Sequence, residues 1–165
     1  MRAEQQAVGG VKQQVADKLD SEGRIPLNRY YDRSPIYPEH FAQDWNRSYE
    51  LMPDGKPVGA VVLLHGLTDS PYSLRHIAED YRRRGFAAIG IRLPGHGTVP
   101  GGLTRVDWEQ WMAATRLDQG EGRQAGGEGG TIPSVGASNG GVMAIQYTLD
   151  VLVSSNLTPT SGGVF

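Results

Sequence analysis

The stretch SVGASNGGVM, residues 134–143, places a serine between two glycines and opens the last periodic segment of the chain. Gly136 and Gly140 stand two residues before and two residues after Ser138, which is the spacing G-x-S-x-G. A serine on a sharp strand-to-helix turn projects its hydroxyl away from a sheet, and the crowded turn requires small neighbours. The stretch therefore predicts a strand, a tight turn with Ser138 at its apex, and a helix.

The residues on both sides of this stretch supply the context that the pattern needs. With 23 glycines in the chain, G-x-S-x-G alone is a weak signal of a catalytic serine. The segment TIPSVGA (131–137) predicts the preceding strand, although Pro133 lacks a backbone N–H and is unusual in a central strand. After Ser138, apolar residues recur at helical spacing and predict an amphipathic helix: Val142, Ile145, Leu149 and Leu152.

Two further strands and a helix are predicted upstream. The segment VGAVVLLHG (58–66) contains a continuous apolar run that suits a strand buried on both faces. Ser70-Pro71 predicts a helix that ends at Gly85, with serine as its N-cap. FAAIGIRL (86–93) predicts the next strand. Strands that alternate with helices at short intervals indicate an α/β fold, with a mostly parallel sheet flanked by helices.

The remaining segments divide the chain into three parts. Residues 1–45 are expected to be an N-terminal extension, with a marginal helix over 3–20 and an irregular segment after it. Residues 46–153 form the expected α/β unit, which includes a short strand within 48–53 and a helix that Asp107 caps. Within that unit, the glycine-rich stretch 118–130 is expected to be a flexible connector. Residues 154–165 are expected to be a loose tail.

Composition excludes several classes of function. A formal net charge of −2 offers no electrostatic basis for binding nucleic acid. The chain has no cysteine, so disulfides and thiolate chemistry are excluded, and nothing in the sequence implies a metal or a cofactor. No apolar run approaches the roughly 20 residues of a membrane span, and the N-terminus lacks an apolar signal core. A cytoplasmic location is therefore expected.

Three unusual loops each follow a predicted strand, and parallel strands bring such loops to one edge of the sheet. They are HGL (65–67), PGHG (94–97) and GASNG (136–140). Together with VVLLHGLTDSPYSLRHIAEDYRRRGFAAIGIRLPGHGTVPGGLTRVDWEQWMAA and VGASNGGVMAIQYTLD, they resemble the N-terminal half of an α/β-hydrolase. The resemblance covers about residues 46–152 and is greatest to the bacterial carboxylesterase, monoacylglycerol lipase and serine-aminopeptidase-like group.

The resemblance implies a serine hydrolase of carboxylic esters that acts through an acyl-enzyme on a small acyl ester substrate. Ser138 would be the nucleophile, and the backbone N–H groups of Leu67 and Asn139 would form the oxyanion hole. Five further residues would shape the site: His65, Gly66, His96, Gly136 and Gly140. Taken from the residues alone, His96 is better explained as a loop histidine bonded within its own turn than as the general base. His40 and His76 are expected at the surface, and Trp108 and Trp111 in the core.

The family orders its triad as serine, then acid, then histidine, and this sequence departs from that order. No histidine follows Ser138, and Asp150, the one acid after it, falls on the predicted helix. The triad acid and histidine, the later strands and the lid are therefore expected to be absent from this chain. The alternative function is a catalytically inactive remnant that at most binds a partner. An unpaired apolar sheet edge would then favour self-association.

Overall fold

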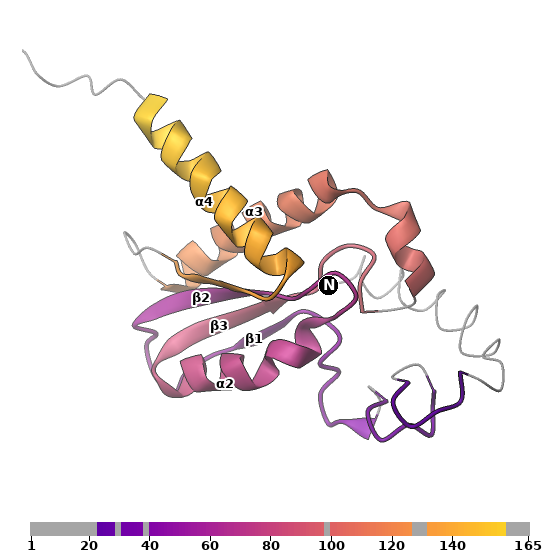
Figure 1. Cartoon of the computed structure of the whole chain (residues 1–165). Coiled ribbons are helices and arrows are strands. Elements are labelled where there is room, and N and C mark those ends of the chain that lie inside the picture. Colours follow the sequence, from indigo (N-terminus) through magenta and orange to yellow (C-terminus); the bar gives the residue numbers. More distant parts are fainter. Residues whose placement is uncertain (1–22, 29–30, 38–39, 98–99, 127–131, 158–165) are drawn as a thin grey trace, which may run out of the picture.

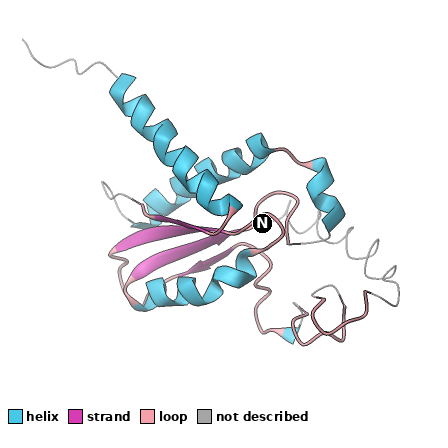
Figure 2. Cartoon of the chain, in the orientation of Figure 1, coloured by secondary structure: helices cyan, strands magenta, loops and turns pink. Residues whose placement is uncertain are grey.

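The computed structural model describes residues 23–28, 31–37, 40–97, 100–126 and 132–157. Four strands form one sheet in the order β1-β3-β2-β4 (Figure 2). The strands are β1 (Tyr49–Leu51), β2 (Gly59–Leu64), β3 (Phe86–Ile91) and β4 (Ser134–Gly136). The helices are η3 (Pro71–Leu74), α2 (Arg75–Arg83), η4 (Pro100–Arg105), α3 (Trp108–Gly126) and α4 (Asn139–Leu157), of which η3 and η4 are short 3-10 helices.

The sheet is mostly parallel, as the alternation of strands and helices predicts. β2 pairs in parallel with β3 on one side and with β4 on the other, whereas β1 runs antiparallel to β3. The carboxyl ends of β2, β3 and β4 therefore meet at one edge of the sheet. The loops that begin at His65, Arg92 and Ala137 leave the sheet at that edge, hereafter the carboxyl rim.

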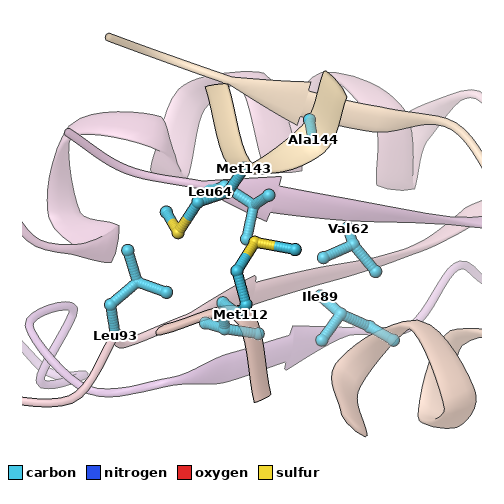
Figure 3. Close-up of a cluster of buried hydrophobic side chains, with 8 residues drawn as sticks. Val62, Leu64, Ile89, Leu93, Met112, Met143 and Ala144 are labelled. Atoms are coloured by element: carbon cyan, nitrogen blue, oxygen red, sulfur yellow. The ribbon is translucent and has the colours of Figure 1, made fainter. Parts of the chain in front are cut away.

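Helices cover both faces of the sheet, as Figure 1 shows. The period-two alternation of β2 divides its side chains between two apolar clusters. On one face, Val62 and Leu64 pack with Met112 of α3 and Met143 of α4 (Figure 3). On the other face, Val61 and Leu63 pack with side chains of η3 and α2. The strand is buried on both sides, which accounts for its unbroken run of apolar residues.

The antiparallel strand β1 is held by an aromatic ring that lies on a glycine. Tyr49 is opposite Gly90 of β3 in the register, and its ring occupies the space that a Cβ at position 90 would need. Such a Cβ would lie 2.7 Å from the Tyr49 hydroxyl oxygen and closer still to the ring carbons. Burial raises the pKa of the Tyr49 hydroxyl well above its usual value, so the group stays protonated and donates to the Pro71 carbonyl at 3.3 Å.

Replacing this glycine should destabilise the fold through overpacking. We expect Gly90→Ala to lower the free energy of unfolding by about 1–3 kcal/mol, measured by urea titration, because Tyr49 is buried and cannot move away freely. In a Tyr49→Leu background, the same change should cost clearly less. Equal costs in the two backgrounds would show that the ring does not create the constraint.

The expectation that the glycine-rich stretch 118–130 is a flexible connector is wrong for its first part. Residues 118–126 are not a connector but continue helix α3, which runs from Trp108 to Gly126; residues 127–131 lie outside the described part of the chain. Gly122 is buried, and a Cβ there would lie 3.3 Å from Ile132 and 3.5 Å from Val62. Close packing of the helix on the sheet therefore outweighs the poor helix propensity of glycine.

Two further local expectations have mixed outcomes at the helix starts. Asp107 caps α3 as expected, since its Oδ1 accepts from the Gln110 N–H at 3.0 Å. Ser70 does not cap with its side chain: its hydroxyl donates to Asn46 Oδ1 at 2.6 Å, and the helix opens with the 3-10 turn η3. Pro133 is accommodated because it immediately precedes β4, where its carbonyl accepts from the Val62 N–H at 3.1 Å.

Some expectations fall outside the described residues. The helix expected over 3–20 lies there, as do residues 158–165 of the expected tail, so the three-part division of the chain stays a prediction. Within the tail, α4 continues to Leu157. In the part of the chain that the structure describes, no helix is long and apolar enough to cross a membrane.

Candidate active site

The turn between β4 and α4 holds Ser138 in an unusual backbone conformation. Its φ is +51°, and it is the one residue other than glycine with a positive φ among the described residues. An L-residue in this left-handed region carries a conformational cost, which persists only where the surrounding structure enforces it. The side chain is exposed at the apex of the turn, directly before the first residue of α4.

The two glycines that flank Ser138 allow the turn to close. A Cβ at Gly136 would overlap the backbone of Gly140 and Gly141. A Cβ at Gly140 would lie 2.7 Å from the His65 carbonyl oxygen and closer still to that of Leu64. The first turn of α4 therefore touches the backbone at the end of β2, which no residue with a side chain could do.

Adjacent glycines of this turn should respond differently to the same substitution. We expect Gly140→Ala to lower the free energy of unfolding by at least about 3 kcal/mol, because its new methyl group meets backbone atoms that cannot rotate away. Gly141→Ala is the matched control: its Cβ would lie 3.4 Å from the Gly136 carbonyl oxygen, and alanine favours the helix.

Gly141→Ala should raise the free energy of unfolding by between zero and about 1 kcal/mol. Chemical denaturation of the two variants, followed by circular dichroism, measures both values. Similar stabilities for the two variants would contradict the close contact between α4 and β2.

The loop after β2 lies directly beside this turn. A Cβ at Gly66 would be 3.5 Å from the Ser138 Cβ and 3.6 Å from the Ala137 carbonyl oxygen. The Ala137 N–H donates to the Leu64 carbonyl at 3.0 Å, which ties the two strand ends together. Within the described residues, neither the Leu67 N–H nor the Asn139 N–H donates a hydrogen bond. The rim therefore brings Ser138 and two available backbone donors into neighbouring loops.

His65 is buried at the centre of the rim and links two of its loops. Its Nδ1 lies 2.9 Å from the Gly66 carbonyl oxygen, and the Leu93 N–H donates to its Nε2 at 3.2 Å. Because a carbonyl can only accept, Nδ1 carries the proton, and because Nε2 accepts, the ring is neutral. Both ring nitrogens of His65 therefore form hydrogen bonds with backbone groups, and neither is available to act as a base.

His96 occupies a second buried position on the same rim. Its ring packs edge-on between His65 and Trp111, with ring centroids 4.9 Å and 5.2 Å apart. The Pro94 carbonyl oxygen lies 2.9 Å from His96 Nδ1 and also accepts from the Trp111 indole N–H at 3.0 Å. The expected bonding of His96 within its own turn is therefore observed, and the loop after β3 is fixed by three aromatic rings.

Two buried polar atoms of the rim have no hydrogen-bond partner in the described part of the chain. They are His96 Nε2, which carries the lone pair of this tautomer, and Asn139 Nδ2, a donor. Unsatisfied buried polar atoms are uncommon and often mark functional sites or bound water. His96 lies in the loop after β3 and Asn139 is the first residue of α4, so both lie at the edge of the sheet that holds Ser138.

Within the described ranges, the Ser138 hydroxyl lacks a side-chain partner that could activate it. Among the described residues, no histidine and no carboxylate forms a hydrogen bond with it. His40 and His76 are exposed; the ring of His40 packs on Tyr37, and His76 lies on α2 across the sheet. Asp150 lies on α4, where hydrogen bonds from Arg116 and Gln146 hold its pKa below the usual value. No group of residues within the described ranges could hold a metal ion.

Sequence reasoning missed two supports of the rim. Asn46 accepts from the buried Ser70 hydroxyl, which anchors the loop after β2 from a segment 24 positions away in sequence. Trp111, expected only as core packing, also donates to the Pro94 carbonyl. Neither contact has a local signal, because both join residues that are distant in sequence. Trp108, also expected in the core, is instead 58 % exposed at the start of α3.

These features define an α/β-hydrolase-type site, with a strained serine at a strand-to-helix turn beside the loop after a central strand. The α/β-hydrolase fold family model matches residues 59–156, more than half of the chain. The chain belongs to this family, which confirms the resemblance seen in its sequence motifs.

The chain is similar to one curated lipase in sequence and to one solved structure in fold. It is 36 % identical over 89 residues to a thermostable monoacylglycerol lipase of Bacillus sp. strain H-257, a match that covers 54 % of this chain and 34 % of the lipase. A solved structure from work on LipS and LipT, two metagenome-derived lipolytic enzymes, is similar with a TM-score of 0.59. That structure is 23 % identical, and the match covers 66 % of this chain and 42 % of the other. This likeness supports the fold alone. The chain thus spans about a third of the lipase it matches.

Proposed function

We propose that this chain carries the nucleophile and the oxyanion hole of a serine hydrolase that acts on carboxylic esters. The observation that supports the proposal is the positive φ of Ser138 next to the Gly66–Leu67 loop. A residue with a side chain adopts this backbone conformation only when the surrounding fold enforces it. Here the enforced conformation exposes the serine hydroxyl at the apex of the turn. The similarity to a monoacylglycerol lipase favours an acyl ester as substrate.

The reaction begins with attack of Ser138 Oγ on the ester carbonyl carbon, while its proton passes to a base. The negative charge that develops on the carbonyl oxygen is stabilised by the N–H groups of Leu67 and Asn139. Asn139 is the first residue of α4, so the positive end of the helix dipole also faces this oxygen. The C–O bond to the alcohol then breaks, and the protonated base gives its proton to the departing alcohol oxygen, which leaves an acyl group on Ser138. Water, deprotonated by the same base, attacks the acyl carbon, and the products are a carboxylic acid and the restored serine hydroxyl.

We place the base outside the described residues, because no described histidine is hydrogen-bonded to Ser138 and His65 uses both ring nitrogens in backbone contacts. A serine hydroxyl without a base is a weak nucleophile at neutral pH. Added imidazole can take the place of the missing histidine, so it provides a direct way to test the nucleophile separately from the base.

A fluorophosphonate probe with added imidazole should modify Ser138. We expect imidazole to raise the rate of adduct formation at Ser138 by at least about tenfold, because a general base removes the hydroxyl proton. The adduct is located by mass spectrometry of the folded, purified chain. Ser138→Ala should remove the adduct, whereas Ser154→Ala, which changes an exposed serine on α4, should leave it unchanged.

Absence of an adduct at Ser138, with and without imidazole, would reject the proposed nucleophile. Modification of several serines at similar rates would do the same, because it would show only general surface reactivity.

A second candidate function is binding without turnover. It is favoured by the absence of any histidine or carboxylate bonded to Ser138 within the described ranges. In this case the strained turn would present a hydroxyl and two backbone donors to a ligand without activating the serine. The two candidates share the same rim and differ only in whether an ester is consumed.

Turnover of p-nitrophenyl acetate by the chain alone separates these two candidates. Without added base, we expect equal rates for the unmodified chain and Ser138→Ala, because nothing in the described structure removes the serine proton. Release of p-nitrophenol that Ser138→Ala abolishes would exclude the binding candidate and would show that the chain supplies its own base.

A further inference from the structure

Asn46 contacts two loops of the carboxyl rim at once, although it precedes the first strand of the sheet. Its side-chain Oδ1 accepts from the Ser70 hydroxyl at 2.6 Å, at the end of the loop after β2. Its backbone carbonyl oxygen lies 2.7 Å from the Cβ position at Gly97, in the loop after β3. Asn46 and Ser70 are both buried, with exposed fractions of 6 and 0 %. One residue therefore connects two of the loops that form the rim.

Neighbouring contacts hold Asn46 itself in place. The Asn46 N–H donates to the Asp44 carboxylate at 3.1 Å, and the same carboxylate accepts from Arg47 Nε at 3.0 Å. On the other side of this turn, the Trp45 ring packs edge-on against the buried ring of Tyr49, with ring centroids 5.1 Å apart. A side chain can hold a second segment accurately only when its own backbone is held, and these contacts meet that condition.

The loop after β2 carries the Leu67 N–H on one tight turn. The Asp69 N–H donates to the Gly66 carbonyl at 3.2 Å, which closes the turn around Leu67. Strand β2 fixes the position at which the turn begins. The residue that follows Asp69 is Ser70, so the hydrogen bond from Ser70 to Asn46 holds the turn at its other end. Leu67 is 45 % exposed, so its own side chain contributes little to holding the turn.

We propose that Asn46 is a positioning residue for the oxyanion hole, and that it acts through Ser70 on the turn that carries the Leu67 N–H. The inference rests on the proposed function, in which this N–H stabilises the charge on the carbonyl oxygen. Such donors work only when they are aimed at the oxygen in advance, and a misplacement of about 1 Å can cost roughly a hundredfold in rate.

The segment that contains Asn46 lies outside the part of the chain that defines the family. The family model matches residues 59–156, and Asn46 precedes that range. An amide suits this position because it offers an oxygen acceptor to a buried hydroxyl without placing a charge there. The proposal therefore adds to the site a residue that the sequence motifs around Ser138 do not include.

The kinetics of Ser138 labelling test the proposal. The purified chain and its variants are treated with a fluorophosphonate at a fixed concentration of imidazole, and the adduct at Ser138 is measured by mass spectrometry over a range of probe concentrations. We expect Asn46→Ala and Ser70→Ala each to lower the maximal labelling rate about tenfold, because the Leu67 N–H is no longer held where charge develops. The probe concentration at half the maximal rate should stay within about twofold, since the change acts on the transition state.

Two further variants separate positioning from general stabilisation. The double variant Asn46→Ala/Ser70→Ala should be no slower than either single variant, because all three lack the same hydrogen bond. Ser48→Ala is the matched control: it removes the bond that Ser48 Oγ accepts from the Arg92 N–H at 2.9 Å, which ends on the loop after β3. This control should be labelled at the rate of the unmodified chain. Circular dichroism at the assay temperature checks that each variant is folded.

The possible results distinguish this proposal from the proposed function. Labelling of Ser70→Ala at the unmodified rate would overturn the positioning role and leave the nucleophile in place; this variant loses only one oxygen atom, so it carries the comparison if Asn46→Ala does not fold. The role would also fail if Ser48→Ala slowed labelling equally, if the two single effects multiplied in the double variant, or if only the half-saturating concentration changed. No adduct at Ser138 in the unmodified chain would reject both proposals.

Discussion

The close contact between the first turn of α4 and the end of β2 is the constraint on which the rest of the site depends. Gly140 lies against the carbonyl oxygens of Leu64 and His65, at a distance that excludes any side chain. The Leu64 carbonyl also accepts from the Ala137 N–H, so the same backbone oxygen fixes both sides of the turn. Because both ends of the turn are held in this way, the backbone at Ser138 is forced into the left-handed conformation.

The rim is built largely from backbone groups that buried rings hold in place. His65 contacts two loops through its two nitrogens, the His96 ring packs beside it, and the Trp111 ring packs on His96. The Pro94 carbonyl receives the bonds from the latter two rings. Through these backbone contacts, the two histidines hold the neighbouring loops in position. The L-H-G and L-P-G-H-G motifs thus have a structural reason that is separate from the chemistry of Ser138.

Local patterns predicted much of this molecule, and contacts between distant residues account for what they missed. The apolar run 61–64 and the glycines around Ser138 predicted β2, the turn and the mostly parallel sheet, because each is set by short-range sterics or burial. Helix α3 continues through the glycine-rich stretch because Gly122 packs on the sheet, which its own sequence does not reveal. The apolar spacing predicted helix α4 but not which of its faces packs inward, because both faces carry apolar residues.

The central claim is that Ser138 and the loop after β2 share one rim at contact distance. The most direct measurement is the nuclear Overhauser effect between protons of Gly66 and the β protons of Ser138 in the isotope-labelled chain. The close approach of these residues, with 3.5 Å between the Ser138 Cβ and the Cβ position at Gly66, predicts a strong cross-peak. A folded chain with assigned signals from both residues and no such cross-peak would place the serine elsewhere and would contradict the account.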